Sequence, residues 1–266
     1  MNRDDLLLLK QWFSGYCASF YTSDEEDNRN LALKEEHTAR VCANILKIAG
    51  EESLGAGDAM IAEATALFHD VGRFPQYAKY KTFKDSLSVN HGELGAKELA
   101  GAGILNNLPV REQEIITTAV KFHNAFKIPD LVRPDAIIFL KMLRDADKLD
   151  IWRIFFEYYG EDSTKDMPSA VGLGFPDTPE YSREVLDCIF NKQLVSLAML
   201  KTLNDFKLTK LSWVYDLNFR SSLRMAVEDN YIDGVTAALP RTGEIRKTVE
   251  IVREYIRRRL EGDQSG

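Results

Sequence analysis

The four histidines of the 266-residue chain are the residues whose type and spacing best indicate chemistry. His37 lies on the apolar side of a predicted helix, with Val41 and Ile48 on the same face. His69 ends an apolar run in ALFHDVGRF and is followed directly by Asp70. Burial of an imidazole or a carboxylate costs free energy unless the group is paired. Each of these inward-facing residues therefore needs a partner.

The other two histidines and a group of aspartates are candidates for these partners. His91 opens a predicted helix in SVNHGELGA, and His123 lies on the inward side of IITTAVKFHN. The segment LRDADKLDIW places Asp145, Asp147 and Asp150 in an otherwise apolar helix. A single histidine on an apolar face is usually a hydrogen-bonded core residue. Since all four histidines occupy inward or helix-end positions, convergence on a metal explains the pattern better.

The donor types restrict the metal. Imidazole and carboxylate without thiolate suit iron, manganese, nickel, cobalt or zinc, whereas magnesium prefers more oxygen ligands. Four histidines and two aspartates are too many for one catalytic ion that keeps an open position, and they suit two ions that share a carboxylate. We therefore expect two divalent transition-metal ions as cofactors. Iron and manganese come first, with nickel, cobalt, zinc and magnesium as alternatives.

Helices must position these residues, because nearly every periodic segment has helical spacing. The expected fold class is all-α. We predict helices over 31–49, 58–69, 91–100, 111–124 and 134–158, with Asn90 or Ser88 capping the third. Prolines and glycines indicate a loop or boundary over 160–181. Three further helices are predicted over 181–206, 210–229 and 243–260.

The composition is that of a globular protein, with 45% hydrophobic and 28% charged residues, and we expect one all-helical domain over 1–266. The net charge of −7 argues against a nucleic-acid-binding surface. Cys17, Cys42 and Cys188 are scattered, which suits reduced thiols. The apolar run Leu6–Leu9 is too short for a signal peptide, and no stretch approaches the roughly 20 apolar residues of a membrane helix. We therefore expect a cytoplasmic protein with neither a nucleic-acid nor a membrane partner.

The order H…HD…H…H…D resembles the HD-domain superfamily of metal-dependent phosphohydrolases. The resemblance covers about residues 30–155 and lies in EEHTARV, ALFHDVGRF and RDADKLD. It implies an HD-domain helical bundle, with the helices over 181–260 as a C-terminal elaboration. It also implies a two-metal site whose ligands are His37, His69, Asp70, His91, His123 and Asp147.

Within that implied site, the first ion is held by His37, His69, Asp70 and the last aspartate, and His91 and His123 hold the second. Asp70 bridges the two. Helical periodicity does not decide which aspartate is last. The family's Ala-Asp pattern favours Asp147, with Asp145 then supporting a ligand or forming a salt bridge.

The implied activity is hydrolysis of a phosphate ester, in a nucleotide or another small phosphorylated molecule, by a metal-bridged hydroxide. Asp70 and Arg73 are the expected catalytic residues. Arg73 follows the His-Asp pair by about one helical turn, so it can face the same cavity. Arg73, Lys148 and Lys81 are expected to bind the substrate's phosphate, and arginine is the best suited to a bidentate contact.

Two alternatives remain open. Some superfamily members with six such ligands are mixed-valent di-iron oxygenases, and other HD-like domains are non-catalytic regulatory modules. Regulatory modules usually lose ligands, whereas all six positions are filled here. The chain lacks the Gly-Tyr-Pro signature of cyclic-di-GMP phosphodiesterases, and it has His91 where guanosine tetraphosphate hydrolases have an acidic pair. The sequence therefore predicts the superfamily and no particular substrate.

Overall fold

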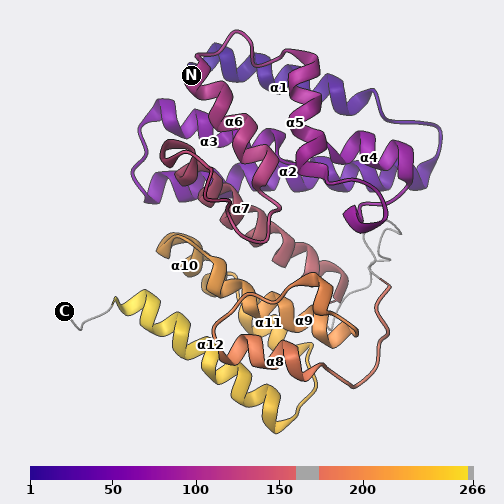
Figure 1. Ribbon diagram of the computed structural model, residues 1–266, viewed down its shortest axis with the longest axis vertical. Coiled ribbons are helices and arrows are strands. Elements are labelled where there is room, and N and C mark those ends of the chain that lie inside the picture. Colours follow the sequence, from indigo (N-terminus) through magenta and orange to yellow (C-terminus); the bar gives the residue numbers. More distant parts are fainter. Residues whose placement is uncertain (160–173, 263–266) are drawn as a thin grey trace. The chain divides into compact units, whose positions relative to one another are not determined.

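The computed structural model describes residues 1–159 and 174–262, which form two compact units (Figure 1). The first unit contains residues 1–150, and the second contains residues 151–159 and 174–262. All regular elements in these ranges are helices, and no strand occurs among the described residues. This confirms the all-α prediction. Of the predicted loop over 160–181, residues 160–173 lie outside the described part of the chain.

The first unit is a helical bundle built on a long central helix, α2 (Glu25–Glu51). Helix α2 packs against α3, α3 packs against α6, and α5 packs against α6. Helix α2 buries Val41, Ile45 and Ile48 on the face that carries His37. The other helices of this unit are α1 (Arg3–Ala18), α3 (Ala56–Phe68), α4 (Arg73–Tyr80), α5 (His91–Ala102), α6 (Val110–Phe122) and the first part of α7 (Pro134–Tyr159).

Local capping sets the starts of the helices that carry the histidines. Asp24 accepts a hydrogen bond from the Asp27 amide, so α2 begins before the predicted residue 31. The Asn90 side chain accepts from the Glu93 amide, which confirms Asn90 as the cap of α5. Helix α7 begins at Pro134, whose missing amide hydrogen costs nothing at a first helical position. Helices α1 and α4 were not predicted.

The second unit contains five helices of its own and an aromatic core. The Trp152 ring packs against Trp213 and Tyr231, with ring centroids 5.7 and 5.8 Å apart. These aromatic side chains bury large apolar areas and so stabilise the unit. Its helices are α8 (Arg183–Phe190), α9 (Leu203–Ser212), α10 (Arg220–Glu228), α11 (Tyr231–Ala237) and α12 (Gly243–Glu261).

The predicted helices over 181–206 and 210–229 are wrong, because each is interrupted. The chain takes a left-handed turn at Lys192, with φ of 54°, after α8 ends. Helix α9 then begins afresh at a capping box formed by Thr202 and Asp205. A 3-10 turn over Trp213–Asp216 and the extended Leu217 separate α9 from α10. The prediction over 243–260 is confirmed by α12.

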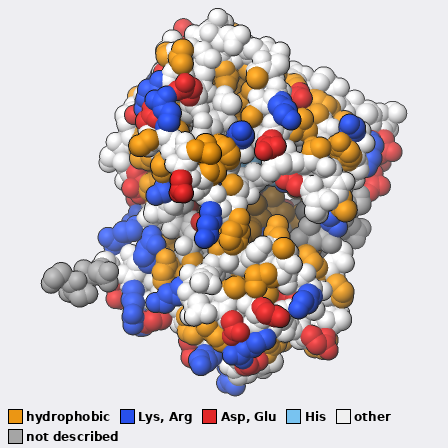
Figure 2. Space-filling view, in the orientation of Figure 1, with side chains coloured by type: hydrophobic (Ala, Val, Ile, Leu, Met, Phe, Trp, Pro, Cys, Tyr) orange, Lys and Arg blue, Asp and Glu red, His pale blue; other side chains and the backbone are white. Residues whose placement is uncertain are grey.

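The surface carries acidic and basic side chains interspersed with apolar ones, as the face in Figure 2 shows. None of the described helices combines the length and the apolar character needed to cross a membrane. All three cysteines are free thiols, and Cys17 and Cys42 are buried.

Candidate metal centre

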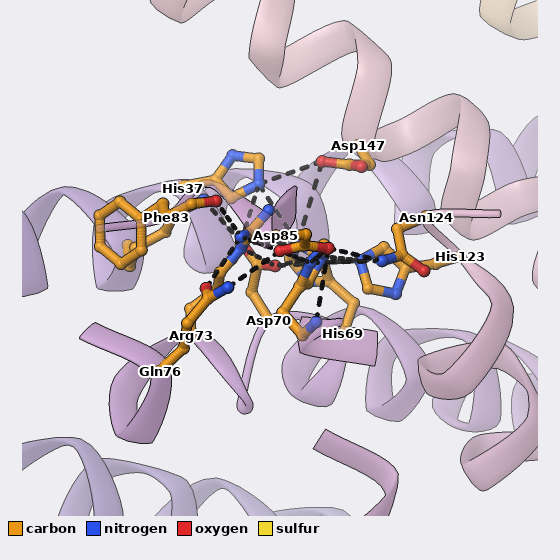
Figure 3. A network of polar contacts seen from close by, with 12 residues as sticks. His37, His69, Asp70, Arg73, Gln76, Phe83, Asp85, His123, Asn124 and Asp147 are labelled. Atoms are coloured by element: carbon orange, nitrogen blue, oxygen red, sulfur yellow. Dashed lines mark hydrogen bonds and ion pairs between the residues drawn. The ribbon is translucent and has the colours of Figure 1, made fainter. Parts of the chain in front are cut away.

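Six side chains predicted to be metal ligands converge inside the first unit (Figure 3). They come from the middle of α2, the end of α3 and the turn after it, the start of α5, the end of α6 and the middle of α7. The four histidines are at most 5% exposed, and Asp70 is 3% exposed. The set is His37, His69, Asp70, His91, His123 and Asp147.

Asp70 lies between two pairs of histidines. Its Oδ2 is 3.7 Å from His37 Nε2 and 3.6 Å from His69 Nε2. Its Oδ1 is 3.5 Å from His91 Nε2 and 3.8 Å from His123 Nε2. Two groups of three potential ligands therefore share one carboxylate. A carboxylate with one oxygen toward each pair has the donor arrangement for a bridge between two ions.

Within each pair, the imidazole nitrogens face each other. His37 Nε2 and His69 Nε2 are 3.2 Å apart, and His91 Nε2 and His123 Nε2 are 3.0 Å apart. Two neutral imidazole nitrogens that both carry lone pairs cannot hydrogen-bond to each other. Which ring nitrogen carries the proton therefore decides what each pair can bind.

Backbone carbonyls fix the proton of two histidines. His69 Nδ1 is 2.7 Å from the Ala66 carbonyl oxygen, and His123 Nδ1 is 2.7 Å from the Val120 carbonyl oxygen. A carbonyl only accepts, so Nδ1 is the donor in both rings. Each of these histidines is the C-cap residue of its helix, and its hydrogen bond to the carbonyl oxygen three residues earlier orients its ring.

Carboxylates fix the proton of the other two histidines. His37 Nδ1 is 2.7 Å from Asp150 Oδ2, and His91 Nδ1 is 2.7 Å from Asp85 Oδ2. All four rings thus present Nε2 to the centre and have an acceptor at Nδ1. Acceptors of this kind behind metal-ligating histidines hold the ring orientation and raise the basicity of the ligand.

The electrostatics keep most of the donors available. Burial lowers the pKa of His69, and it lowers the pKa values of His91 and His123 to about 4, so these imidazoles are neutral at neutral pH. Burial alone would raise the pKa of Asp70, but the neighbouring charges, Lys34 foremost, hold it well below its usual value. Neutral imidazole and ionised carboxylate are the protonation states that bind metal.

His37 differs because it lies between two carboxylates. Burial lowers its pKa, but hydrogen bonds with Asp147 and Asp150 outweigh burial and raise the pKa to about 9. Asp147 Oδ1 is 3.1 Å from His37 Nε2 and 3.9 Å from His69 Nε2. A divalent cation at this position would replace the proton of His37 Nε2, since metal ligands release their protons on binding.

Of the aspartates in α7, Asp147 is the one that joins the cluster of candidate ligands. Its side chain is 19% exposed, more than those of the histidines or Asp70. The sequence expectation gave the supporting role to Asp145. In the structure Asp150 makes the supporting contact, at His37 Nδ1, and Asp145 is buried.

The residues predicted to bind phosphate occupy different positions. Arg73 Nε is 3.4 Å from Asp70 Oδ1, and its Nη1 donates to Asp85 Oδ1 at 2.9 Å. The Lys148 ammonium donates to the Arg144 carbonyl oxygen within α7. Lys81 is exposed, and its ammonium pairs with Asp27. The structure thus brings Arg73 to the candidate ligands, whereas Lys148 contacts the backbone of its own helix and Lys81 pairs with Asp27.

Several polar residues around the centre were missed by sequence reasoning. Lys34 Nζ is 2.8 Å from Asp70 Oδ2. Asp85, in a 3-10 turn over Asp85–Leu87, accepts from Gln76 Nε2 at 2.9 Å and from Asn124 Nδ2 at 3.2 Å. Lys34 had a sequence signal, because it lies one helical turn before His37. Asp85 had none, because it lies in an irregular polar segment.

Residues 35–152 match the family model of the HD domain. The matched segment contains all six candidate ligands and extends from the middle of α2 into α7. This match bears out the resemblance to the HD-domain superfamily that the motifs of residues 30–155 indicate. The buried His-Asp cluster is compatible with the divalent metals that HD-domain proteins bind. Comparison with curated proteins and with solved structures found no match to this chain.

Proposed function

We propose that this chain is a metal-dependent phosphohydrolase that cleaves a phosphate ester in a small phosphorylated molecule. The observation that carries the proposal is the arrangement of the histidines in two pairs, one at each oxygen of Asp70, with the two Nε2 atoms of each pair facing each other. Their Nε2 atoms are 3.0 and 3.2 Å apart, and every Nδ1 already has an acceptor. Two cations, one at each histidine pair, would give all four Nε2 atoms and both oxygens of Asp70 a positively charged partner.

The donor set fits two divalent transition-metal ions, with iron or manganese as the first candidates. His37, His69 and Asp147 would hold one ion, His91 and His123 would hold the other, and Asp70 would contact both. When bound, such ions polarise a phosphoryl oxygen and lower the pKa of a coordinated water toward neutrality.

The chain's own residues supply orientation and a low-dielectric surrounding. Asp150 and Asp85 hold the rings of His37 and His91, and Arg144 donates to the His123 carbonyl oxygen at 3.0 Å. Burial of the histidines excludes bulk water and so strengthens every charge interaction at the centre. Arg73 contacts both Asp70 and Asp85. These contacts support a role in positioning the two carboxylates, beside the catalytic role expected from the sequence.

The test compares the metal content of the untagged protein with that of a His91→Ala, His123→Ala double variant. We expect about two transition-metal ions per chain in the wild type and about one in the variant, because the variant removes two ligands from one group. Circular dichroism before and after metal removal checks that the variant folds. Hydrolysis of a panel of phosphate esters by the metal-loaded wild type then tests the activity.

Three results would contradict the proposal. Absence of metal from the wild type, even after reconstitution, would contradict an enzymatic function and favour a regulatory HD module. One ion in both proteins would return His91 and His123 to structural or substrate-binding roles. Bound iron with oxygen consumption, and without ester hydrolysis, would support the di-iron oxygenase alternative.

A further inference from the structure

Lys34 reaches the carboxylate that the two groups of ligands share. It lies on α2 one turn before His37, and its Nζ is 2.8 Å from Asp70 Oδ2. Its side chain is 16% exposed, whereas the side chain of Asp70 is 4% exposed. The ammonium of a more accessible residue therefore contacts the buried carboxylate.

Each oxygen of Asp70 has one side-chain cation in addition to its imidazole pair. Lys34 is at Oδ2, the oxygen that faces His37 and His69. Arg73 is at Oδ1, the oxygen that faces the other histidine pair, with its Nε 3.4 Å away. These two cations thus neutralise the carboxylate at the positions where divalent cations would bind.

The two cations differ in what else holds them. Arg73 also donates to Asp85 Oδ1 and Gln76 Oε1, each at 2.9 Å. Among the described residues Lys34 forms one ion pair, with Asp70, and its Nζ lies 5.2 Å from the centroid of the Phe83 ring. A divalent cation at Asp70 would repel both side chains, and Lys34 is the one with fewer bonds to keep it in place.

We propose that Lys34 is an exchangeable counter-ion of Asp70 that binds the anionic phosphate of the substrate once metal occupies the centre. The inference rests on the proposed function. Lysine suits this exchange because its ammonium is a compact charge with three donors on a flexible stem. Released from Asp70, the ammonium stays beside the metal ligands, where the phosphate of a substrate must lie.

The first measurement separates exchange from ordinary support. Mn²⁺ is titrated calorimetrically into metal-free wild type, Lys34→Met and the control variant Lys10→Met. Lys10 is a matched control because its ammonium also pairs with one carboxylate, that of Glu63, at 2.5 Å. It lies on α1, which provides none of the candidate ligands. We expect Lys34→Met to bind Mn²⁺ at least as tightly as the wild type, since a competing cation is gone. A residue that merely supports the ligands would weaken Mn²⁺ binding when it is replaced.

The second measurement uses inorganic phosphate as the probe. It is titrated into the Mn²⁺-loaded proteins, and we expect Lys34→Met to raise the Kd for phosphate roughly 10- to 100-fold, as for the loss of a charged hydrogen bond. Lys10→Met should bind phosphate like the wild type. Lys34→Arg keeps the charge and should retain most of the affinity, and it provides the comparison if Lys34→Met does not fold.

The outcomes distinguish this inference from the proposed function. Unchanged phosphate affinity in Lys34→Met, or weakened Mn²⁺ binding, would overturn the role of Lys34 and leave the metal centre intact. If the wild type binds no Mn²⁺, the proposed function fails, and the role of Lys34 fails with it.

Discussion

At the scale of single residues, the acceptors behind the histidines decide what the cluster can bind. A buried imidazole with its proton on Nε2 would block the centre, whereas a proton on Nδ1 leaves Nε2 free as a ligand. Asp85 favours the second state for His91, and Asp150 holds the Nδ1 proton of His37, with N–O distances of 2.7 Å. At His37 a divalent cation would still have to replace the Nε2 proton that Asp147 stabilises. The acceptors therefore matter for function as much as the ligands do.

Replacing Asp150 with asparagine tests this argument. The amide can offer an N–H to His37 Nδ1, which moves the ring proton to Nε2 and removes the lone pair. We expect Asp150→Asn to weaken Mn²⁺ binding at one site by about 10- to 100-fold, measured calorimetrically. Asp85→Asn should do the same at the His91 side. Mn²⁺ affinity within twofold of the wild type in both variants would contradict a role for these acceptors.

The sequence indicated the residues that the structure brings together, and it did so through residue type and order. His69 and Asp70 are adjacent and end an apolar run, so their burial and need for partners could be predicted. The role of Asp85 could not be predicted, because its contact with His91 depends on a 3-10 turn in a segment with no apolar periodicity. Whether the six residues hold metal stays a prediction.

At the scale of elements, a close approach between two chain segments brings His91 toward Asp70. A Cβ built on Gly72 would lie 2.2 Å from the His91 carbonyl oxygen and 2.6 Å from the Gly95 amide nitrogen. Both neighbours are backbone atoms, which cannot rotate away. The turn after Asp70 can therefore lie against the start of α5 only because residue 72 has no side chain.

Gly72→Ala should consequently separate these elements and damage the centre. We expect a loss of about 1–3 kcal/mol in the free energy of unfolding, the usual cost of overpacking, measured by urea denaturation. Mn²⁺ binding at the His91 side should weaken as well. Gly101→Ala is the matched control, because it lies in α5 with nothing within 4 Å of its added Cβ. Equal stability of the two variants would contradict the steric argument.

Helices with a long apolar stripe were predictable, and interrupted ones were not. The stripe of α2 and the cap at Asn90 follow from spacing and side-chain chemistry that the sequence displays. The break after α8 depends on the left-handed backbone of Lys192, and the break after α9 depends on a 3-10 turn over Trp213–Asp216. The residue types at these positions do not indicate that a helix ends there. Apolar periodicity continued through these breaks, so pattern alone joined the segments.

At the scale of the whole molecule, the candidate centre lies entirely within one of the two compact units. All six candidate ligands fall in residues 1–150, and so do Lys34, Arg73, Asp85 and Asp150. The protein as a whole carries a net charge of −7, so its overall field repels anions. On the proposed function, a phosphorylated substrate would therefore depend on local cations at the centre, for which the candidates are bound metal ions, Lys34 and Arg73.

Metal removal should act mainly on the unit that contains the centre. Mn²⁺ at about 100 times its Kd stabilises the folded state by about 2.7 kcal/mol per site, because it binds the folded protein. We expect hydrogen exchange, followed by mass spectrometry, to slow in α2, α3, α5 and α6 when Mn²⁺ is added and to recover with EDTA. The His91→Ala, His123→Ala variant should show a smaller effect in α5 and α6. Equal slowing throughout α8 to α12 would contradict a centre whose ligands all belong to residues 1–150, since local ligation orders the elements that provide the ligands.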